Sequence, residues 1–484
     1  MNTVLKHYPA MKESGVPWLG EVPEYWGVKP NRALFEEVKD QGHPDEPMLS
    51  VTISRGVISQ DDLLADTSKK DSSNLDKTKY KLVQPGDIAY NKMRAWQGAV
   101  GSSKLRGIIS PAYIVQRPRS GVQAEYMHYL MRTPAFAKEA ERWSYGITSD
   151  MWSLRPEHFK MIYSCCPPIS EQTAIVRYLE YMDRRIQRYI RAKQKLIKLL
   201  EEQKQAIIHR AVTRGLDPAV PLKPSGVEWL GDIPAHWEVV RLKEASTPIE
   251  QGWSPQCDAQ PTADNEWGVL KVGCVNGDAF DSSQNKKLPT SLEPVPNLQV
   301  RNGDILVSRA NTRDLLGLAA LAVNPREKLM LCDKLFRFRV KPGRVDPRFL
   351  VYTMRQRTSR AQIETSTNGA SDSMQNIGQA VVRNLLLALP SLDEQLKIVK
   401  SLESQTHTCA SSIAQTQREI TLLREYSTRL IADVVTGKLD VREAATNLPD
   451  DAEDEELVEE ISEREGSDQI LEDLESEPTE EVEV

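Results

Sequence analysis

The sequence has no long hydrophobic run, no cysteine pair at metal-ligand spacing and no glycine-rich phosphate loop. Within its 484 residues there is no stretch of about 18 apolar residues, so no transmembrane helix is expected. The opening segment, MNTVLKHYPAMKESG, lacks the apolar core that a secretory signal requires. None of the six cysteines belongs to a CxxC pair or has a histidine at ligand spacing. These absences predict a reduced, cytoplasmic protein without structural zinc.

Motifs for catalysis are missing as well. There is no GxxxxGK(S/T) loop for ATP and no GxGxxG loop for a dinucleotide. The segment nearest to the (D/N)PP(F/Y) box of adenine methyltransferases is DPRF at residues 346–349, which lacks the second proline and is more typical of a turn before a helix. Ser308 and Ser371 have no histidine within a recognisable triad motif. The sequence therefore predicts no catalytic, cofactor-binding or metal-binding residue in this chain.

The net charge of −7 is the sum of two parts of opposite sign. Residues 450–484 contain 18 acidic residues and one basic residue, which leaves 61 basic and 51 acidic residues in the rest of the chain. The acidic segment has low complexity and is predicted to be disordered, and a solubilising role is favoured over mimicry of DNA or docking to a partner. The body, with a net charge of +10, is compatible with a polyanionic partner.

Long stretches of the sequence occur twice. SGVPWLGEVPEYW (14–26) returns as SGVEWLGDIPAHW (225–237), VQPGDIAYNKMRA (83–95) as VRNGDILVSRANT (300–312), and CCPPISEQTAIVRYLE (165–180) as LALPSLDEQLKIVKSLE (387–403). The GDI segments read as a polar turn followed by a strand, and YMHYLMRT (126–133) and FLVYTMRQ (349–356) read as helices. A spacing above 200 residues is too long for a solenoid or propeller, so the pattern indicates a duplicated domain.

After each Pro–Glu–Gln landmark the sequence becomes helical. Residues 171–214 and 394–436 contain neither glycine nor proline, and their apolar residues recur every three or four positions. Ser170 and Asp393 stand at expected N-cap positions, and Gly215 and Gly437 at expected stops. The predicted coiled-coil seam consists of Ile175, Leu179, Met182, Ile186, Leu196, Leu200 and Ile207 in the first helix and Ile398, Leu402, Ile413, Ile420, Leu423 and Leu430 in the second.

The connectivity predicts how these parts are arranged. Each helix of about 43 residues would be roughly 65 Å long, and an apolar stripe of that length needs a partner. If the helices pair, the second must run back along the first, so the fold class is α+β with two duplicated globular domains separated by an antiparallel pair of long helices, in pseudo-two-fold symmetry. The expected boundaries are a first domain at 1–169, helix one at 170–215, a linker and second domain at 216–392, helix two at 393–437 and a C-terminal segment at 438–484.

The GVxWLGxxPxxW opening, the GDI strand and the P…EQ..I…L start of a long helix, each present twice, resemble the specificity (S) subunits of type I restriction–modification systems. The resemblance spans about residues 5–445. It implies two target-recognition domains, each reading one half of an asymmetric bipartite DNA site, and helices that act as a spacer. The acidic segment departs from the family pattern, and the resemblance implies nothing about its role.

The resemblance also implies partners and chemistry outside this chain. Two methyltransferase (M) subunits that bind S-adenosylmethionine would dock on the helices and methylate adenine at N6. Two restriction (R) subunits would add ATP- and Mg²⁺-dependent cleavage. The chain itself would be a non-catalytic DNA-recognition subunit that contacts double-stranded DNA and no membrane. A self-sufficient DNA methyltransferase or nuclease, and a coiled-coil scaffold that ignores DNA sequence, remain as alternatives.

Candidate DNA contacts are the Arg, Lys, Asn and Gln residues on polar loops, because these side chains bind base edges and phosphates. In the first domain the candidates are Lys69, Lys70, Asn91, Lys92, Arg94 and Gln97, and in the second they are Gln284, Asn285, Lys286, Arg309, Asn311 and Arg313. Arg94 and Arg309 are expected near corresponding positions after the GDI strand. The tryptophans of the repeated phrase, Trp18, Trp26, Trp229 and Trp237, are expected to pack each N-terminal segment onto its domain.

Overall fold

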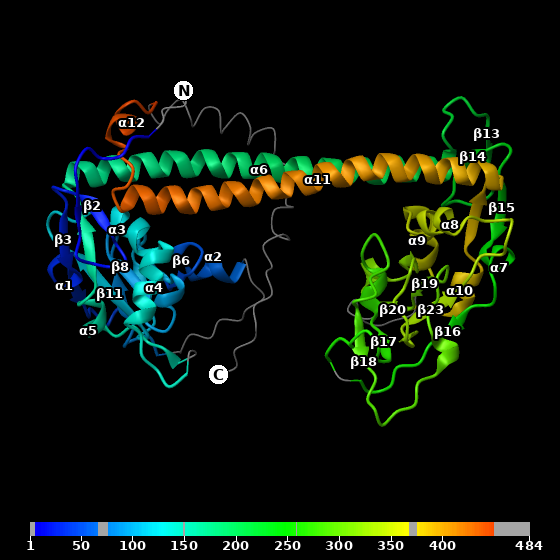
Figure 1. Ribbon diagram of the computed structural model, residues 1–484, viewed down its shortest axis with the longest axis horizontal. Coiled ribbons are helices and arrows are strands. Elements are labelled where there is room, and N and C mark those ends of the chain that lie inside the picture. The colour runs from blue at the N-terminus through cyan, green and yellow to red at the C-terminus, as the bar shows by residue number, and fades with distance from the viewer. Residues whose placement is uncertain (1–4, 66–75, 149–150, 258, 367–374, 450–484) are drawn as a thin grey trace. The chain divides into compact units, whose positions relative to one another are not determined.

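The computed structural model describes residues 5–65, 76–148, 151–257, 259–366 and 375–449, and it divides into two compact units (Figure 1). Unit 1 comprises residues 1–192 and 419–484, and unit 2 comprises residues 193–418. Each unit contains one globular part and a portion of both long helices, α6 (Ile169–Arg214) and α11 (Leu392–Val435). Among the described residues, none of the helices combines the length and the apolar character of a membrane span.

Both globular parts are built on a four-stranded antiparallel sheet with the same topology. In unit 1 the strand order is β4 (Phe35–Val38), β11 (Tyr113–Pro118), β8 (Ile88–Asn91) and β9 (Val100–Ser102). In unit 2 it is β16 (Glu250–Gln251), β23 (Leu335–Phe338), β19 (Ile305–Ser308) and β21 (Ala319–Leu321). The helices that follow are α3 (Ala124–Met131) and α4 (Pro134–Arg142) in unit 1, and α8 (Pro347–Met354) and α9 (Arg357–Glu364) in unit 2. The duplicated α+β fold is confirmed, together with the strands after GDI and the two helical segments.

Smaller elements complete each unit. In unit 1 they are the antiparallel pairs β1 (Met11–Glu13) with β2 (Glu21–Pro23), β3 (Gly27–Pro30) with β12 (Tyr163–Cys166), β5 (Leu49–Thr52) with β6 (Gly56–Ser59) and β7 (Lys81–Val83) with β10 (Gly107–Ile109), and the short helices α1 (Asn31–Leu34), α2 (Gln60–Ala65), η1 (Ala95–Gln97), α5 (Pro156–Phe159) and α12 (Arg442–Thr446). In unit 2 they are the pairs β13 (Leu222–Pro224) with β14 (Asp232–Pro234), β15 (Glu238–Arg241) with β25 (Leu386–Leu389) and β20 (Ala310–Asn311) with β24 (Gln375–Asn376), the sheet of β18 (Asn285–Lys287), β17 (Gly268–Leu270) and β22 (Leu329–Met330), and the short helices α7 (Leu242–Ala245), η3 (Val272–Val275), η4 (Pro296–Leu298), η5 (Arg313–Leu315) and α10 (Gln379–Arg383).

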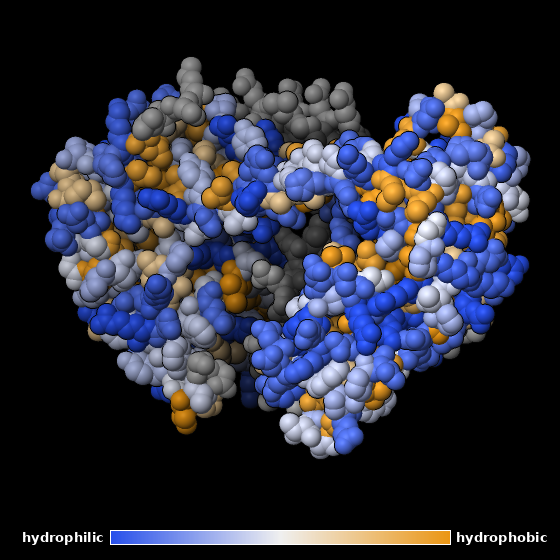
Figure 2. Space-filling model, turned by 45° about the vertical axis from the view of Figure 1, so that its right-hand side comes forward, coloured by the Kyte–Doolittle hydropathy of each residue, from blue (hydrophilic) through white to orange (hydrophobic). Residues whose placement is uncertain are grey.

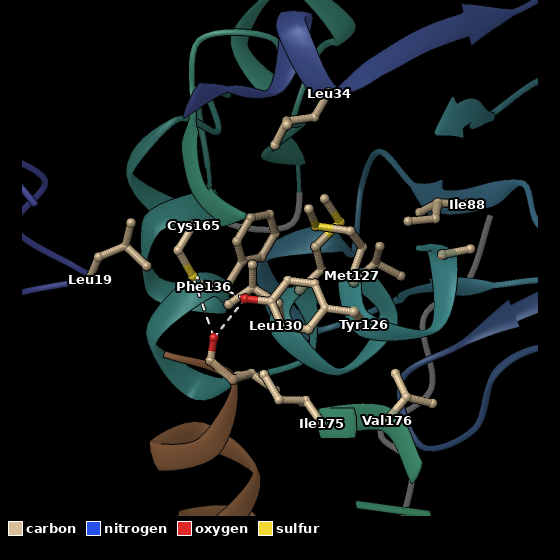
Figure 3. Packing of buried hydrophobic residues seen from close by; sticks show 14 of the residues in the cluster. Leu19, Leu34, Ile88, Tyr126, Met127, Leu130, Phe136, Cys165, Ile175 and Val176 are labelled. Atoms are coloured by element: carbon tan, nitrogen blue, oxygen red, sulfur yellow. Dashed lines mark hydrogen bonds between the residues drawn. The ribbon is translucent and has the colours of Figure 1, made fainter. Parts of the chain in front are cut away.

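The two long helices are antiparallel within each unit. In unit 1 one buried cluster joins the beginning of α6, including Ile175 and Leu179, to the end of α11, including Val434. Figure 3 shows Ile175 and Val176 beside the core residues of α3, and its dashed lines mark the hydrogen bonds that the Tyr126 hydroxyl (2.8 Å) and the Cys165 thiol (3.4 Å) donate to the Val435 carbonyl near the end of α11. In unit 2 the corresponding cluster joins the end of α6 to the beginning of α11 through Ile208, Ala211, Val212, Ile398, Val399 and Leu402. The predicted antiparallel pairing is therefore present in both units.

The predicted N-caps are wrong, whereas the predicted helix stops are confirmed. Ser170 already lies inside α6, and the N–H groups of Glu171 and Gln172 donate to the carbonyl of Pro168. In α11 the side chain at the cap is that of Ser391, whose Oγ accepts the Glu394 N–H at 3.4 Å, so Asp393 falls in the first turn. Gly215 and Gly437 both end their helices with positive φ, at 76° and 77°, a conformation that glycine adopts without strain.

Each long helix is fastened to its globular part by a buried glutamine. Gln172 Oε1 accepts the backbone N–H of Gln123 at 2.8 Å, and its Nε2 donates to the carbonyls of Gly121 at 3.0 Å and Pro167 at 2.8 Å. In unit 2 the fully buried Gln395 has three equivalent partners, the backbone groups of Asp346, Arg344 and Pro390 at 2.8, 3.1 and 2.9 Å. Because buried polar atoms require such partners, this residue of the Pro–Glu–Gln landmark is a structural joint.

The glutamate of the same landmark meets the repeated tryptophan phrase. In unit 1 Glu171 accepts hydrogen bonds from the hydroxyls of Tyr8 at 2.5 Å and Tyr25 at 3.0 Å, and burial together with this carboxylate raises the pKa of Tyr8 far above its ordinary value. In unit 2 Glu394 accepts the Trp237 indole N–H at 3.1 Å. The phrase thus holds the start of each helix.

The tryptophans of this phrase pack as predicted in three of four cases. Trp26 and Trp237 are fully buried, and Trp18 packs edge-on against Phe136 with ring centroids 5.5 Å apart. Trp229 instead remains 38% exposed. The buried pair therefore supplies most of the aromatic packing at these joints.

One predicted seam residue is wrong. The seam residues that are buried are Ile175, Leu179, Ile186, Ile398, Leu402, Ile420 and Leu430, and those that are half-buried are Met182, Leu200, Ile207, Ile413 and Leu423. Leu196 is instead 45% exposed. Successive residues of an α-helix are rotated by about 100° around its axis, so Leu196 points roughly 80° away from Ile186. Ile190 and Ile197, by contrast, point within about 40° of the direction of Ile186. Ile190 is accordingly buried, and sequence reasoning missed it.

We expect Gln395→Leu to destabilise unit 2 by about 2–4 kcal/mol, because three backbone groups lose their buried partners. The measurement is the midpoint of thermal unfolding of the full chain. Gln405→Leu on the exposed face of the same helix, where the amide bonds only Ser401 Oγ, is the matched control and should shift stability by less than about 0.5 kcal/mol. Equal shifts for the two variants would contradict the role given to Gln395.

Candidate nucleic-acid interface

The GDI motif forms a turn that contains a buried aspartate and fixes the direction of the following strand. Gly86 has a φ of 87°, and Asp87 Oδ2 accepts the backbone N–H of Gln84 at 3.0 Å. Arg117 on the neighbouring strand β11 binds both oxygens of this carboxylate, at 2.8 and 2.9 Å, which raises the pKa of the guanidinium. The equivalent residues in unit 2 are Asp304 with Arg301, Gly303 and Arg339. Both sheets therefore position the end of the GDI strand in the same way.

The loop after β8, residues 91–99, forms the first part of the candidate interface and is called the post-GDI loop of unit 1. Asn91 Oδ1 accepts the Met93 N–H at 3.0 Å, and the Trp96 indole N–H donates to the Met93 carbonyl at 2.9 Å. Asn91 thereby helps to shape the loop. Arg94 and Gln97 are exposed on the loop, and Lys92 is half-buried.

The segment between α4 and α5 supports this loop. Leu154 donates its N–H to the Lys92 carbonyl at 2.8 Å, and the rings of Trp96 and Trp152 pack with centroids 5.5 Å apart. The same segment exposes three apolar side chains, those of Tyr145, Ile147 and Met151. Sequence reasoning missed them because a search for DNA contacts among charged and amide residues passes over apolar ones.

In unit 2 the post-GDI loop comprises residues 308–318. Ser308 Oγ donates to the Leu315 carbonyl at 2.5 Å, and strand β20 within the loop pairs with β24. Arg309 lies over the Phe336 ring at 6.0 Å, and its Nη1 donates to the Asp333 carbonyl at 3.3 Å. The arginine is therefore half-buried and packs against strand β23.

Arg94 and Arg309 lie near corresponding positions, as expected, but they are two residues away from being direct counterparts. The carbonyl of Arg309 accepts the Ile377 N–H at 3.0 Å, as the carbonyl of Lys92 accepts that of Leu154. Both residues directly follow the last residue of the GDI strand. Lys92 is thus the counterpart of Arg309, and the sequence offset then pairs Arg94 with Asn311.

Several further candidates of unit 2 lie near this loop. The Asn311 amide donates to Asn276 Oδ1 at 3.1 Å, and Asn276 directly follows helix η3. The backbone of Gln284 accepts the N–H of Lys271, the residue before η3, at 2.8 Å. Arg313 is exposed within η5, with its guanidinium 4.0 Å from Glu364.

Asn285 is the candidate that the structure contradicts. Its side chain is buried, its Oδ1 accepts the Thr262 N–H at 2.9 Å, and its Nδ2 donates to the carbonyls of Ser282 at 2.8 Å and Ser283 at 3.3 Å. These bonds occupy the amide inside the fold. The neighbouring Lys286 is exposed. Lys69, Lys70 and the acidic segment lie outside the described residues.

Two arginines that the sequence analysis did not select are structural. Arg132 donates to the carbonyls of Val100 at 3.1 Å and Ile53 at 2.7 Å, and Arg355 in unit 2 donates to the carbonyl of Ala319 at 2.9 Å. Burial lowers the pKa of both guanidinium groups. Each ties the helix before it to the strand that follows the post-GDI loop.

Unit 1 also contains a cavity of about 290 Å³ beside β6, β9 and α3. Burial lowers the pKa of its histidine, His128, to about 3, and His128 Nδ1 accepts the Ser102 N–H at 3.2 Å. Lys104 and Glu180 form an ion pair of 3.7 Å at the same cavity. These groups are engaged within the fold, and no cluster of three potential metal ligands occurs in the described parts of the chain.

Comparisons with known proteins agree with this architecture, although no family model matches the chain. It is 31% identical over 215 residues to the type I restriction enzyme EcoEI specificity subunit of Escherichia coli, a match that covers 44% of this chain and 36% of that protein. It is 21% identical over 448 residues to the StySPI specificity subunit of Salmonella potsdam, which covers 88% and 92% of the two chains.

A solved structure also has this fold. It comes from a structural study of complex assembly and conformational transition of the type I R-M system. The TM-score is 0.63 at 16% identity, and the match covers 86% of this chain and 99% of that one.

We expect Asn285→Ala to destabilise unit 2 by about 1–3 kcal/mol, because buried backbone groups lose their partners. Lys286→Ala, one residue away and exposed, should change stability by less than about 0.5 kcal/mol. Thermal unfolding of both variants tests this difference. A stable Asn285→Ala protein that binds DNA more weakly than the wild type would instead restore Asn285 as a contact residue.

Proposed function

We propose that the chain belongs to the specificity subunits of type I restriction enzymes and that it selects the DNA site by reading one half of an asymmetric bipartite sequence with each unit. The observation that carries this proposal is that the two units share the topology of the four-stranded sheet but carry different loops. At the start of the post-GDI loops the first unit has Lys92, Met93 and Arg94 where the second has Arg309, Ala310 and Asn311. Side chains that differ at equivalent places would distinguish different base pairs.

The polar side chains of these loops divide by chemistry. Arg94 and Gln97 are exposed and could form paired hydrogen bonds to base edges in the major groove. Lys286 offers a point charge suited to phosphate, which fixes position without specifying sequence. A basic body favours the same polyanion. The complex would act in the cytoplasm, where it meets chromosomal and incoming DNA.

The long helices supply the surface on which we place the partner subunits. Large apolar side chains are exposed along them, namely Tyr189, Leu196 and Leu199 on α6 and Leu422 and Tyr426 on α11. Exposed apolar groups of this kind mark protein contacts. Two methyltransferase subunits would cover them, and restriction subunits would join the complex. This proposal also accounts for Leu196, which is turned away from the helix seam.

In this proposal the chain is non-catalytic and binds no cofactor. S-adenosylmethionine would be held by the methyltransferase subunits, and ATP and Mg²⁺ by the restriction subunits. This chain contributes the choice of sequence. A self-sufficient methyltransferase or nuclease would bind its cofactor as a single purified chain, and a scaffold would bind all duplexes equally at fixed salt.

Mapping methylated adenines in cells with and without the gene for this chain tests the proposal. We expect methylation at one bipartite motif, with two specified halves and unspecified bases between them, only in cells that contain the gene. The complex purified from the same cells should prefer that motif over a scrambled duplex. An unchanged methylation pattern together with equal affinity for every duplex would disprove site selection by this chain.

We expect Arg94→Ala and Arg309→Ala each to relax recognition of one half-site only, because the two residues belong to different units. A lost base contact costs about 1–3 kcal/mol, so affinity for the cognate half should fall by roughly 5- to 150-fold. Fluorescence anisotropy with duplexes mutated in either half is the measurement. Lys12→Ala, an exposed change on β1 of unit 1, is the control. Loss of discrimination in both halves from one substitution would contradict independent reading.

A further inference from the structure

An exposed apolar tip stands beside the post-GDI loop of unit 1. It is formed by the side chains of Tyr145, Ile147 and Met151, which are 58%, 91% and 44% exposed. Figure 1 shows the segment between α4 and α5 extending away from the sheet of unit 1, and at the corresponding end of this unit Figure 2 shows an orange protrusion on a mainly blue surface. Three large apolar side chains grouped on one projection indicate a contact surface.

The base of the tip is firmly held. Tyr145 and Ser153 pair as an antiparallel bridge, with N–H to carbonyl distances of 3.3 and 3.1 Å. The Tyr145 ring packs on His158 with centroids 4.9 Å apart, and the Trp143 indole N–H donates to Glu139 at 2.8 Å. A base held in this way reduces the conformational freedom that Tyr145 loses when the tip binds.

The tip and the post-GDI loop share one surface. Trp152 on the tip segment packs against Trp96 on the loop, and the Leu154 N–H binds the Lys92 carbonyl. The loop contributes Lys92 and Arg94, and residues 91–98 contain no acidic residue. The segment that carries the apolar group is therefore joined to the loop that carries the cationic side chains, a combination that matches a duplex, whose phosphates are anionic and whose base edges include an apolar group.

We propose that Ile147 and Met151 are specificity-determining residues that contact the C5-methyl group of thymine in the half-site read by unit 1. The thymine methyl is the apolar group on base edges in the major groove. Lys92 and Arg94 bind the flanking phosphates or polar base edges, and the tip distinguishes A·T from G·C pairs. This inference rests on the proposed function and adds to it the kind of base that unit 1 selects.

The repeat predicts that this preference is stronger in unit 1. At the offset of 223 residues that relates the two Pro–Glu–Gln landmarks, Ile147 aligns with Ala370, Tyr145 with Asn368 and Met151 with Met374. The second copy therefore keeps the methionine but has a small and a polar residue in place of the isoleucine and the tyrosine, and these three counterparts lie outside the described residues. Because the second copy lacks two of the three apolar side chains, the thymine preference should be weaker in the half-site of unit 2.

The test replaces thymine by uracil, which removes only the methyl group. The assembled complex of the full chain with its methyltransferase subunits is titrated by fluorescence anisotropy against duplexes carrying its methylation motif, with the substitution in one half at a time. We expect wild-type affinity to fall about fourfold for each contacted methyl, the effect of one buried methyl-sized group. The substitution in the other half should have a smaller effect, because only the methionine recurs there.

The double variant Ile147→Ala with Met151→Ala should bind thymine and uracil duplexes equally, at the weaker affinity. Leu105→Ala removes an apolar side chain elsewhere in unit 1 that is as exposed as that of Met151, and it should retain the wild-type response. The inference is overturned if uracil has no effect on the wild type, if the double variant keeps the thymine preference, or if it fails to assemble with the methyltransferase subunits, which would make the tip a protein contact. Absence of any preference between motif and scrambled duplexes would instead refute the proposed function itself.

Discussion

The buried amide at the start of each long helix is the interaction on which the rest of the structure depends. A helix of more than forty residues with an apolar stripe holds no fixed direction unless its ends are tied to packed domains. Gln172 and Gln395 provide these ties through three backbone hydrogen bonds each. The adjacent Glu171 and Glu394 bind the aromatic phrase that opens each repeat. One short motif therefore couples the start of a helix, the N-terminal segment and the globular part of the same unit.

The residues that stabilise the fold are also distinct from the residues that we propose to contact DNA. The charged residues shared by both units are used inside the fold, as when Arg117 and Arg339 bind the buried aspartates of the GDI turns. Arg132 and Arg355 likewise donate hydrogen bonds to backbone carbonyls. The side chains proposed to distinguish bases lie on the loops beyond the strand ends that both units share. Base preference can therefore change by substitution on a loop without loss of a buried partner, and the fold tolerates such change because exposed substitutions cost little stability.

The duplication, the antiparallel helices and the glycine stops could be predicted because they follow from long-range repetition and simple periodicity. The details that failed depend on three-dimensional neighbours. Ser391 caps α11 in place of Asp393 because the helix begins two residues earlier than its composition suggests. In the sequence Asn285 looks like any polar residue of a loop, yet its side-chain amide is buried and accepts the backbone N–H of Thr262. No local pattern distinguishes an asparagine that supports a turn from one that faces DNA.

The exposed apolar side chains also follow from this division between scaffold and reader. Burying an isoleucine or leucine side chain is worth about 1.5–3 kcal/mol, so several of them left in water in a chain with well-packed cores favour a partner that covers them. Those on α6 and α11 lie on regular helices, a surface that another protein can match by packing. Those of the apolar tip, Tyr145, Ile147 and Met151, stand on a narrow projection next to the post-GDI loop that carries Arg94, too small for a stable protein interface and suited to a groove. Shape and neighbouring charge thus assign the two groups to different partners, protein on the helices and nucleic acid at the tip.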